Sequence, residues 1–187
     1  MAHRVCPWWL GYFLTCPLRR RGQNPFKILK PYVRPGMTVL EPGPGMGFFT
    51  LDLARLVGDS GRVVTVDIQA KMLSRLRCRL EKAGLVGRTQ IRLVQPDSMA
   101  LDDLAGRVDF ALAFALVHEM PSAEKFFAET ARTLKPGGTL LLAEPTGHVK
   151  SEQFEEELAA AARAGLTVSD RPAIRRSHTA LLTKTSA

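Results

Sequence analysis

The chain has 187 residues, a length typical of one domain with a sizeable core. Hydrophobic residues make up 45% and charged residues 24%, as in ordinary globular proteins, which excludes a disordered or fibrous chain. No apolar run is long enough to span a bilayer. The three cysteines lack metal-ligand spacing, so we expect a reduced, cytoplasmic setting and no metal site.

The net charge of +8 raises the question of a nucleic-acid partner. The arginines come in three groups, at 19–21, at 75–79 and at 175–176. Outside the amino terminus no aromatic residues are interleaved with them, as a groove for single-stranded nucleic acid would need. The charge therefore leaves a nucleic-acid partner open without favouring it.

The amino-terminal segment, residues 1–35, differs from the rest in composition. Residues 5–18 are apolar and aromatic, and three arginines follow them, whereas a signal peptide carries its basic residues before the apolar run. A helix packed on the core, a lid over a pocket and an interfacial contact all stay open. We divide the chain into this cap or lid segment and a main domain, residues 36–187. The aromatic residues of the segment are Trp8, Trp9, Tyr12 and Phe13.

A glycine-rich loop follows the first predicted strand, Thr38–Leu40. The strand ends on Glu41, and three glycines come next at alternate positions, Gly43, Gly45 and Gly47. Glycine lets the backbone turn sharply and approach a ligand closely. The spacing differs from the Gly-x-Gly-x-x-Gly of nicotinamide-binding loops, and no Gly-Lys-Ser/Thr ends it, as in a phosphate-binding loop. An acid beside a loop without lysine indicates a nucleoside-type ligand that carries positive charge.

Predicted strands and helices then alternate along the chain. The strand expected at 139–144 is apolar throughout, which implies burial on both faces, as in a parallel sheet covered by helices. We expect further strands at 62–67, 91–95 and 108–114, helices at 48–57, 69–82 and 122–134, and a short helical segment near 99–104.

The carboxyl-terminal part breaks this alternation. Ser151 is placed to cap a helix over residues 151–164, and two β-type segments, 166–170 and 178–184, follow with no helix between them. Such a pair is expected to run antiparallel. The predicted fold class is therefore α/β, with a single doubly wound, mainly parallel, seven-stranded sheet and a carboxyl-terminal antiparallel hairpin.

Acidic residues follow the next two strands, where ligands of doubly wound sheets bind. Asp67 ends the second strand and can accept hydrogen bonds from both ribose hydroxyls, while Ile68 can pack on a flat base. After the third strand, Asp97 can accept from the exocyclic amine of adenine, with Ser98 beside it. Alternatively, Asp97 or Ser98 only caps the following helix.

The fourth strand leads to a candidate catalytic group. The strand ends at Phe114, and small residues beside it would let a ligand lie against the backbone. His118 can serve as a general base, because its unperturbed pKa is near physiological pH. Alternatively, His118 is a structural hydrogen-bonding residue at the start of the next helix, and Glu119 is an acid of its first turn.

Together, the order and spacing of several motifs resemble those of the class I S-adenosylmethionine-dependent methyltransferases, in the broad type 11 group. The resemblance covers roughly residues 35–145 and implies a Rossmann-like methyltransferase fold with strand order 3-2-1-4-5-7-6. It also implies S-adenosyl-L-methionine as the cofactor. The motifs that carry it are 39–47, 64–67, 96–98, 109–120 and the Leu-Lys-Pro-Gly-Gly turn and strand at 134–144.

The same resemblance implies a set of cofactor-binding residues. It places the methionine moiety against Gly43, Gly45 and Phe114, and it places Glu41 near the sulfonium or amino group. The whole set that it implies is Glu41, Gly43, Gly45, Gly47, Asp67, Ile68, Asp97, Ser98 and Phe114.

The acceptor is less well defined by the sequence. Enzymes that act on exocyclic base amines resemble Asn/Asp-Pro-Pro-Tyr/Phe after the fourth strand, where this chain has Ala-Leu-Val-His at 115–118. We therefore expect a small-molecule acceptor, with its O, N, S or C atom unassigned. The aromatic segment before residue 19 favours an apolar or aromatic acceptor, or a thiol shielded from water. Its four aromatic residues and His118 are the candidate acceptor-binding residues. An RNA methyltransferase and a cofactor-binding module without catalysis stay open.

Overall fold

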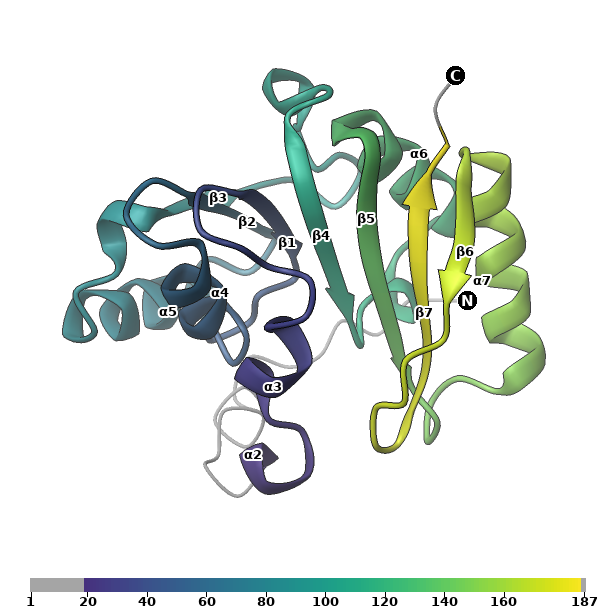
Figure 1. The fold of residues 1–187 in the computed structure, drawn as a ribbon, viewed down its shortest axis with the longest axis horizontal. Helices are drawn as coiled ribbons and strands as arrows, with labels where there is room; N and C mark the ends of the chain where they lie inside the picture. The colour runs from purple at the N-terminus through teal and green to yellow at the C-terminus, as the bar shows by residue number, and fades with distance from the viewer. Residues whose placement is uncertain (1–18, 186–187) are drawn as a thin grey trace. The chain divides into compact units, whose positions relative to one another are not determined.

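The computed structural model describes residues 19–185, which form two compact units that meet in the sequence between Met99 and Ala100 (Figure 1). Hydrogen-bonded pairing orders the strands β3-β2-β1-β4-β5-β7-β6 in a seven-stranded sheet. This confirms the predicted fold class and strand order.

The first unit holds three parallel strands, with β2 paired to both β1 and β3. Helices α4 and α5 pack on these strands. In α5 the residues at helical spacing, Met72, Leu73, Leu76 and Leu80, are buried, and Gly84 with φ +67° follows the helix end. Its elements are α2 (Arg19–Gly22), α3 (Pro25–Leu29), β1 (Thr38–Pro42), α4 (Thr50–Val57), β2 (Arg62–Asp67), α5 (Ala70–Lys82), η2 (Val86–Arg88) and β3 (Thr89–Leu93).

The second unit pairs β4 with β5 in parallel and closes with an antiparallel β5-β7-β6 arrangement. Figure 1 shows α7 running alongside β6, and α7 contacts α6 as well. Its elements are η3 (Asp102–Leu104), β4 (Val108–Phe114), η4 (Val117–Glu119), α6 (Ala123–Thr133), β5 (Leu134–Pro145), α7 (Ser151–Arg163), β6 (Leu166–Asp170) and β7 (Ser177–Lys184).

The junction of α6 and β5 differs from the prediction. We expected the helix to extend to Leu134 and the strand to begin after a Lys-Pro-Gly-Gly turn, but β5 begins at Leu134 itself. The register with β4 shifts there, because Val108 pairs with Leu134 and Phe110 with Thr139. The turn residues therefore form a bulge within the strand.

Two predicted caps are wrong. Ser151 is the first residue of α7 rather than its cap; Lys150 precedes the helix, and its N–H donates to Gln153 Oε1 at 3.0 Å. Asp97 and Ser98 do not begin a helix either, since they lie in an exposed turn closed by a bridge between Gln95 and Ser98. The alternative that Asp97 or Ser98 only caps a following helix is therefore excluded.

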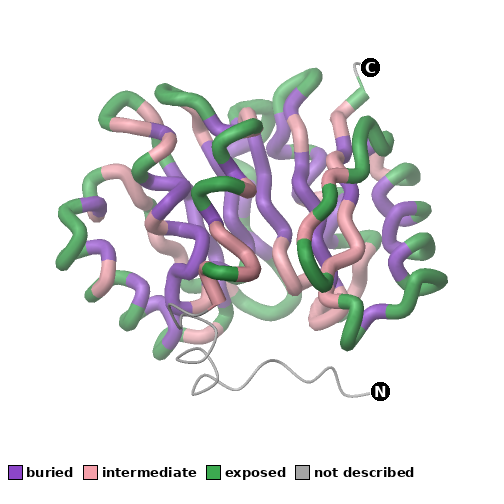
Figure 2. Tube along the Cα trace, turned by 60° about the horizontal axis from the view of Figure 1, so that its bottom comes forward, coloured by how far each residue is buried: buried purple, intermediate pink, exposed green. Residues whose placement is uncertain are grey.

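The core follows the strands in both units (Figure 2). Leu140, Leu141, Leu142 and Ala143 of β5 are fully buried, as their uninterrupted apolar sequence predicts. Within residues 19–185, the helices are too short or too polar to cross a membrane.

Candidate active site

Glu41 lies at the end of β1 and is buried, with 3% of its surface exposed. Within the described chain, its Oε2 atom is buried without a hydrogen-bond partner. Burial raises the pKa of Glu41 to about 8. A side-chain hydrogen bond with Thr50 opposes this rise in pKa, and the negative charge of Asp67 adds to it. A buried carboxyl with an unused acceptor is costly for the fold, and a cationic ligand would relieve that cost.

The glycine loop between β1 and α4 takes the sharp turn that its sequence predicts. Gly43, Gly45 and Gly47 all have positive φ, at +63°, +54° and +83°. The N–H of Gly43 donates to the Val66 carbonyl at 2.8 Å, which ties the loop to β2. Gly43 is exposed and Gly45 is half-buried, so the loop backbone is accessible to a ligand.

Arginines from two other helices hold this loop and the start of α4. Arg79 of α5 donates from Nη1 to the Met46 carbonyl. Arg20 of α2 pairs with the buried Asp52 of α4 at 2.9 Å. The sequence did not indicate this contact, because the partner of Arg79 is a backbone carbonyl 33 residues away in the chain.

Asp67 and Ile68 form a polar and apolar pair at the end of β2. The Asp67 Oδ1 atom accepts from the Gln69 N–H at 2.8 Å, which fixes the turn after the strand. Asp67 is 9% exposed, whereas the neighbouring Ile68 is 38% exposed, an unusual position for a large apolar side chain. The combination offers carboxylate acceptors next to a surface on which a flat ring can pack.

The remaining predicted residues lie in different places. Phe114 ends β4 in the second unit, half-buried and paired in register with Ala143. The aromatic candidates for acceptor binding, Trp8, Trp9, Tyr12 and Phe13, lie outside the described residues, so their role stays a prediction.

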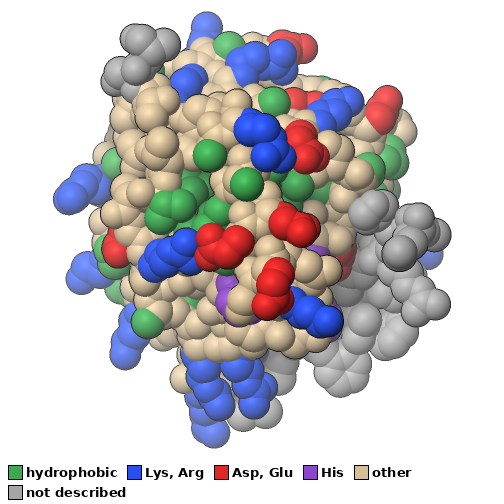
Figure 3. Space-filling model, turned by 90° about the vertical axis from the view of Figure 1, so that its right-hand side faces the viewer, with side chains coloured by type: hydrophobic (Ala, Val, Ile, Leu, Met, Phe, Trp, Pro, Cys, Tyr) green, Lys and Arg blue, Asp and Glu red, His purple; other side chains and the backbone are tan. Residues whose placement is uncertain are grey.

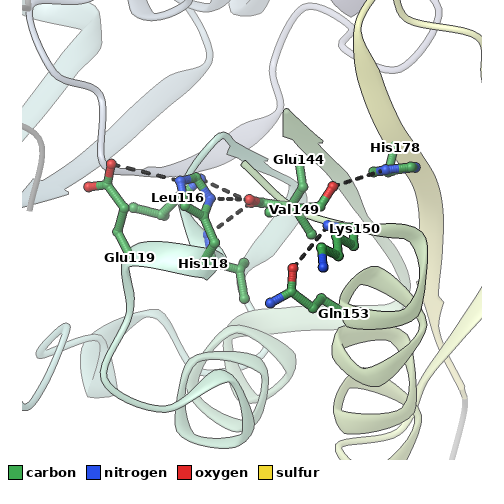
Figure 4. A network of polar contacts seen from close by, with 9 residues as sticks. Leu116, His118, Glu119, Glu144, Val149, Lys150, Gln153 and His178 are labelled. Carbon is green, nitrogen blue, oxygen red and sulfur yellow. Dashed lines mark hydrogen bonds and ion pairs between the residues drawn. The ribbon is translucent and has the colours of Figure 1, made fainter. Parts of the chain in front are cut away.

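His118 is held by Glu144, the buried acid near the end of β5 (Figure 4). The His118 Nδ1 atom hydrogen-bonds Glu144 Oε2. The other oxygen, Oε1, accepts from the N–H groups of Leu116 and Val117 at 3.0 and 2.9 Å. On the opposite side of the ring, His118 Nε2 lies 3.9 Å from Glu119 Oε1.

The charges around His118 favour its protonated form. Burial by itself lowers the pKa of His118, but the hydrogen bond and charge of Glu144, with the charges of Glu119 and Glu157, outweigh burial and raise the pKa above 6.5. Burial also raises the pKa of Glu157 to about 8, and the charge of Glu144 adds to that rise. A histidine in this setting can take up a proton and hold it.

The chain matches a protein family described as a methyltransferase domain over residues 39–138, more than half of its length. It belongs to this methyltransferase family. The match confirms the resemblance drawn from the sequence motifs, that to the class I S-adenosylmethionine-dependent methyltransferases.

The individual proteins to which the chain is similar are also named as methyltransferases. The ubiquinone/menaquinone biosynthesis C-methyltransferase UbiE of Enterobacter sp. (strain 638) is 39% identical over 113 residues, which cover 60% of this chain and 44% of that protein. The UbiE of Shewanella halifaxensis is 36% identical over 120 residues, 64% of this chain and 47% of that protein. The chain therefore spans less than half the length of these relatives. A SAM-dependent methyltransferase of Aquifex aeolicus is 26% identical, with a TM-score of 0.85, over 97% of this chain and 100% of that one.

Two acids of the candidate site were not singled out in the sequence. Glu144 directly follows the apolar run 140–143 of β5, and an acid in such a position is a usable signal for a buried, hydrogen-bonded group. No sequence signal indicated that Glu157 is buried, because it lies in a run with Glu155 and Glu156 that is typical of a solvated helix face. Only its burial, 8% exposed, distinguishes it.

A matched pair of glycine substitutions tests the packing of the loop in this methyltransferase. A Cβ at Gly47 would lie 2.5 Å from Leu76 Cδ1, whereas a Cβ at Gly45 would meet nothing within 4 Å. Both substitutions carry the strain of a positive φ, so their difference reports packing. We expect Gly47→Ala to lower the free energy of unfolding by about 2–4 kcal/mol and Gly45→Ala by about 1 kcal/mol. Urea unfolding measures both, and equal losses would contradict this packing.

The raised pKa of Glu41 predicts an unusual pH dependence of stability. The folded state holds this proton between the ordinary pKa of 4.5 and about 8, whereas the unfolded chain releases it. Stability is therefore lost as pH rises through this window, and Glu41→Gln removes that loss. At about pH 9 the free energy of unfolding of the variant should exceed that of the wild type by roughly 1.4 kcal/mol, the value of one pKa unit, or more. Below about pH 4.5 the two proteins should differ little in stability.

Urea unfolding at both pH values measures this difference. The same change at the exposed Glu155, Glu155→Gln, is the control and should not alter the pH dependence in this way. A wild type that gains stability over Glu41→Gln as the pH rises would show that the Glu41 carboxyl is not buried and protonated.

Proposed function

We propose that this methyltransferase transfers the methyl group of S-adenosyl-L-methionine to a small molecule. The observation that carries the donor half is Glu41, a buried acid with an unused oxygen beside an accessible glycine loop. Dinucleotides and nucleoside triphosphates bring negative charge to such a place, whereas this donor brings a sulfonium and an amino group. The names of the UbiE relatives, which act in quinone biosynthesis, support a small-molecule acceptor.

The donor site that we propose uses the residues identified from the sequence. Glu41 faces the positive charge, Asp67 holds the ribose hydroxyls, and Ile68 packs on the adenine. Bound donor supplies a methyl group already activated by its sulfonium, so the protein contributes mainly position and exclusion of water. The remaining members of the proposed donor site are Gly43, Gly45, Gly47, Asp97, Ser98 and Phe114.

The acceptor half of the proposal rests on His118. Its ring is anchored by a buried carboxylate, and the surrounding acids raise the pKa of His118, which makes the neutral ring a stronger base. We propose that residues 1–35 form a cap over the acceptor and residues 36–187 the catalytic domain. An apolar, aromatic or thiol acceptor suits the aromatic residues of that cap.

An RNA acceptor would need a continuous basic surface. On the side that carries β6 and α7, acidic and basic side chains lie next to one another (Figure 3). Two of the basic residues there are engaged in ion pairs, Arg171 with Glu155 at 2.9 Å and Arg163 with Glu124 at 3.1 Å. This mixed face supports the small-molecule proposal over an RNA methyltransferase.

The proposal is tested with donor labelled in its methyl group, incubated with the purified protein and a cell extract. The products are separated by size, and a parallel sample is treated with ribonuclease. We expect the label in the low-molecular-mass fraction, unchanged by ribonuclease. Label that is lost from a high-mass fraction on ribonuclease treatment, with binding that weakens steeply with salt, would instead identify an RNA acceptor. No transfer at all would point to a binding module.

A further inference from the structure

Both carboxylate oxygens of Glu144 are engaged by the same segment, the loop after β4. Its Oε1 atom accepts two backbone N–H groups, those of Leu116 and Val117, and its Oε2 atom binds the His118 ring (Figure 4). The side chain is fully buried, at 0% exposure. A buried carboxylate can only accept hydrogen bonds, so the ring nitrogen that faces it must carry the hydrogen.

We infer that Glu144 is a positioning residue that fixes His118 as the Nδ1–H tautomer, so that Nε2 carries no hydrogen and can remove a proton from the methyl acceptor. This inference rests on the proposed function and narrows it. The accepting atom must begin with a proton that it loses, as in a hydroxyl, an amine, a thiol or an activated carbon. An acceptor that reacts through a lone pair alone, such as a thioether, would not need this arrangement.

The step balances in atoms and charge. The acceptor atom forms its bond to the methyl carbon as the bond from that carbon to the sulfonium sulfur breaks, and the sulfur keeps the electron pair. The proton of the acceptor moves to His118 Nε2. The positive charge that began on sulfur therefore ends on the imidazolium, where Glu144 stabilises it.

The loop that presents His118 is held in a strained conformation by the same strand. Ala115 has φ +55°, a region that residues with a side chain rarely adopt, and its N–H donates to the Ala143 carbonyl at 2.7 Å. Glu144 then secures the next two N–H groups. One acid therefore sets both the backbone of the loop and the orientation of the ring, which is what precise placement of a base requires.

Other titratable groups around the ring support proton uptake. Glu119 lies 3.9 Å from Nε2, and Glu157 of α7 adds negative charge near the ring once the pH exceeds its raised pKa of about 8. The ring of His148 lies edge-on, with its centroid 5.7 Å from that of His118. These acids favour the imidazolium form of His118.

The test is nitrogen-15 NMR of the protein labelled in its histidines, which reports the tautomer directly and needs no substrate. The sequence contains four histidines, and a His118→Asn sample assigns the signal of interest. In the wild type at a pH where the ring is neutral, we expect Nδ1 protonated and Nε2 bare. This measurement requires no change at Glu144, so it holds even where a variant at that position fails to fold.

The Glu144→Gln variant extends the test to catalysis. Its amide oxygen can still accept from the backbone N–H groups, while its NH₂ group faces Nδ1 and forces the hydrogen onto Nε2. We expect that tautomer in the spectrum, a fall in kcat of about 10²- to 10⁴-fold, and little change in donor affinity. Loss of the Glu144 charge should also lower the pKa of His118. The acidic limb of the pH profile of kcat/KM should therefore move to lower pH. Glu155→Gln, the same change on the surface, should alter none of these.

An Nε2–H tautomer in the wild type, or an unchanged tautomer in Glu144→Gln, overturns the inference whatever the activity. An altered tautomer with full activity in the variant overturns it as well. The proposed function fails separately, if wild-type protein with the expected tautomer transfers no label to the low-mass fraction.

Discussion

Replacing His118 by asparagine is expected to lower kcat by about 10²- to 10⁴-fold while leaving donor affinity within a few-fold of the wild type. Asparagine can keep a hydrogen bond to Glu144, but it cannot take up a proton at the position of Nε2. The loss therefore falls on the chemical step rather than on binding. Initial rates at saturating donor measure the fall in kcat, and calorimetric titration of the same preparation measures the donor affinity.

His178 provides the matched control. It also stands in the second unit and is part-buried, but its Nε2 atom bonds the Val149 carbonyl and its ring stacks on Phe154. We expect His178→Asn to cost stability and to leave kcat nearly unchanged. Equal losses of kcat in the two variants would mean that His118, like His178, has only a structural role.

Replacing Asp67 by asparagine is expected to weaken donor binding by about 30- to 1,000-fold, equivalent to about 2–4 kcal/mol. The asparagine oxygen can still accept from the Gln69 N–H, so the turn after β2 is preserved. Its NH₂ group, however, faces the ligand with donors where the ribose hydroxyls need acceptors. Calorimetric titration with S-adenosyl-L-methionine and with S-adenosylhomocysteine should show the same loss, because both contain the ribose.

The exposed Asp59 allows the same substitution away from the proposed site. It pairs only with Arg88 on the surface in the described structure, with 91% of its side chain exposed. Asp59→Asn should bind the donor as the wild type does. A donor affinity that falls equally in both variants, or in neither, would contradict a ribose-binding role for Asp67.

Much of the fold was predictable because burial leaves a pattern in the sequence. Arg62–Asp67 and Val108–Phe114 form strands with the bounds that we predicted, since apolar runs between turn residues specify them. The start of β5 was not predictable in the same way. A Lys-Pro-Gly-Gly sequence is typical of a turn, and only pairing with β4 draws the bulged segment into the strand.

The candidate site was predictable where its residues follow strands directly. Glu41 and Asp67 were identified as candidates because ligands of this fold class bind at the carboxyl ends of the strands. Glu144 and Glu157 became visible only in the structure, since their importance comes from burial and from contact with His118. Residue spacing does not reveal the loss of solvation on which such contacts depend.

Proton release on donor binding most directly tests the central claim, that the donor binds beside the buried Glu41 carboxyl. If Glu41 is buried and protonated in the free protein, a cationic donor should drive its ionisation, so binding near pH 7 releases a proton. Calorimetry in buffers of different ionisation enthalpy measures this number. We predict close to one proton released by the wild type with S-adenosyl-L-methionine and none by Glu41→Gln, which should bind more weakly. Donor binding without proton release, or with equal affinity in the variant, would contradict a donor site built on Glu41.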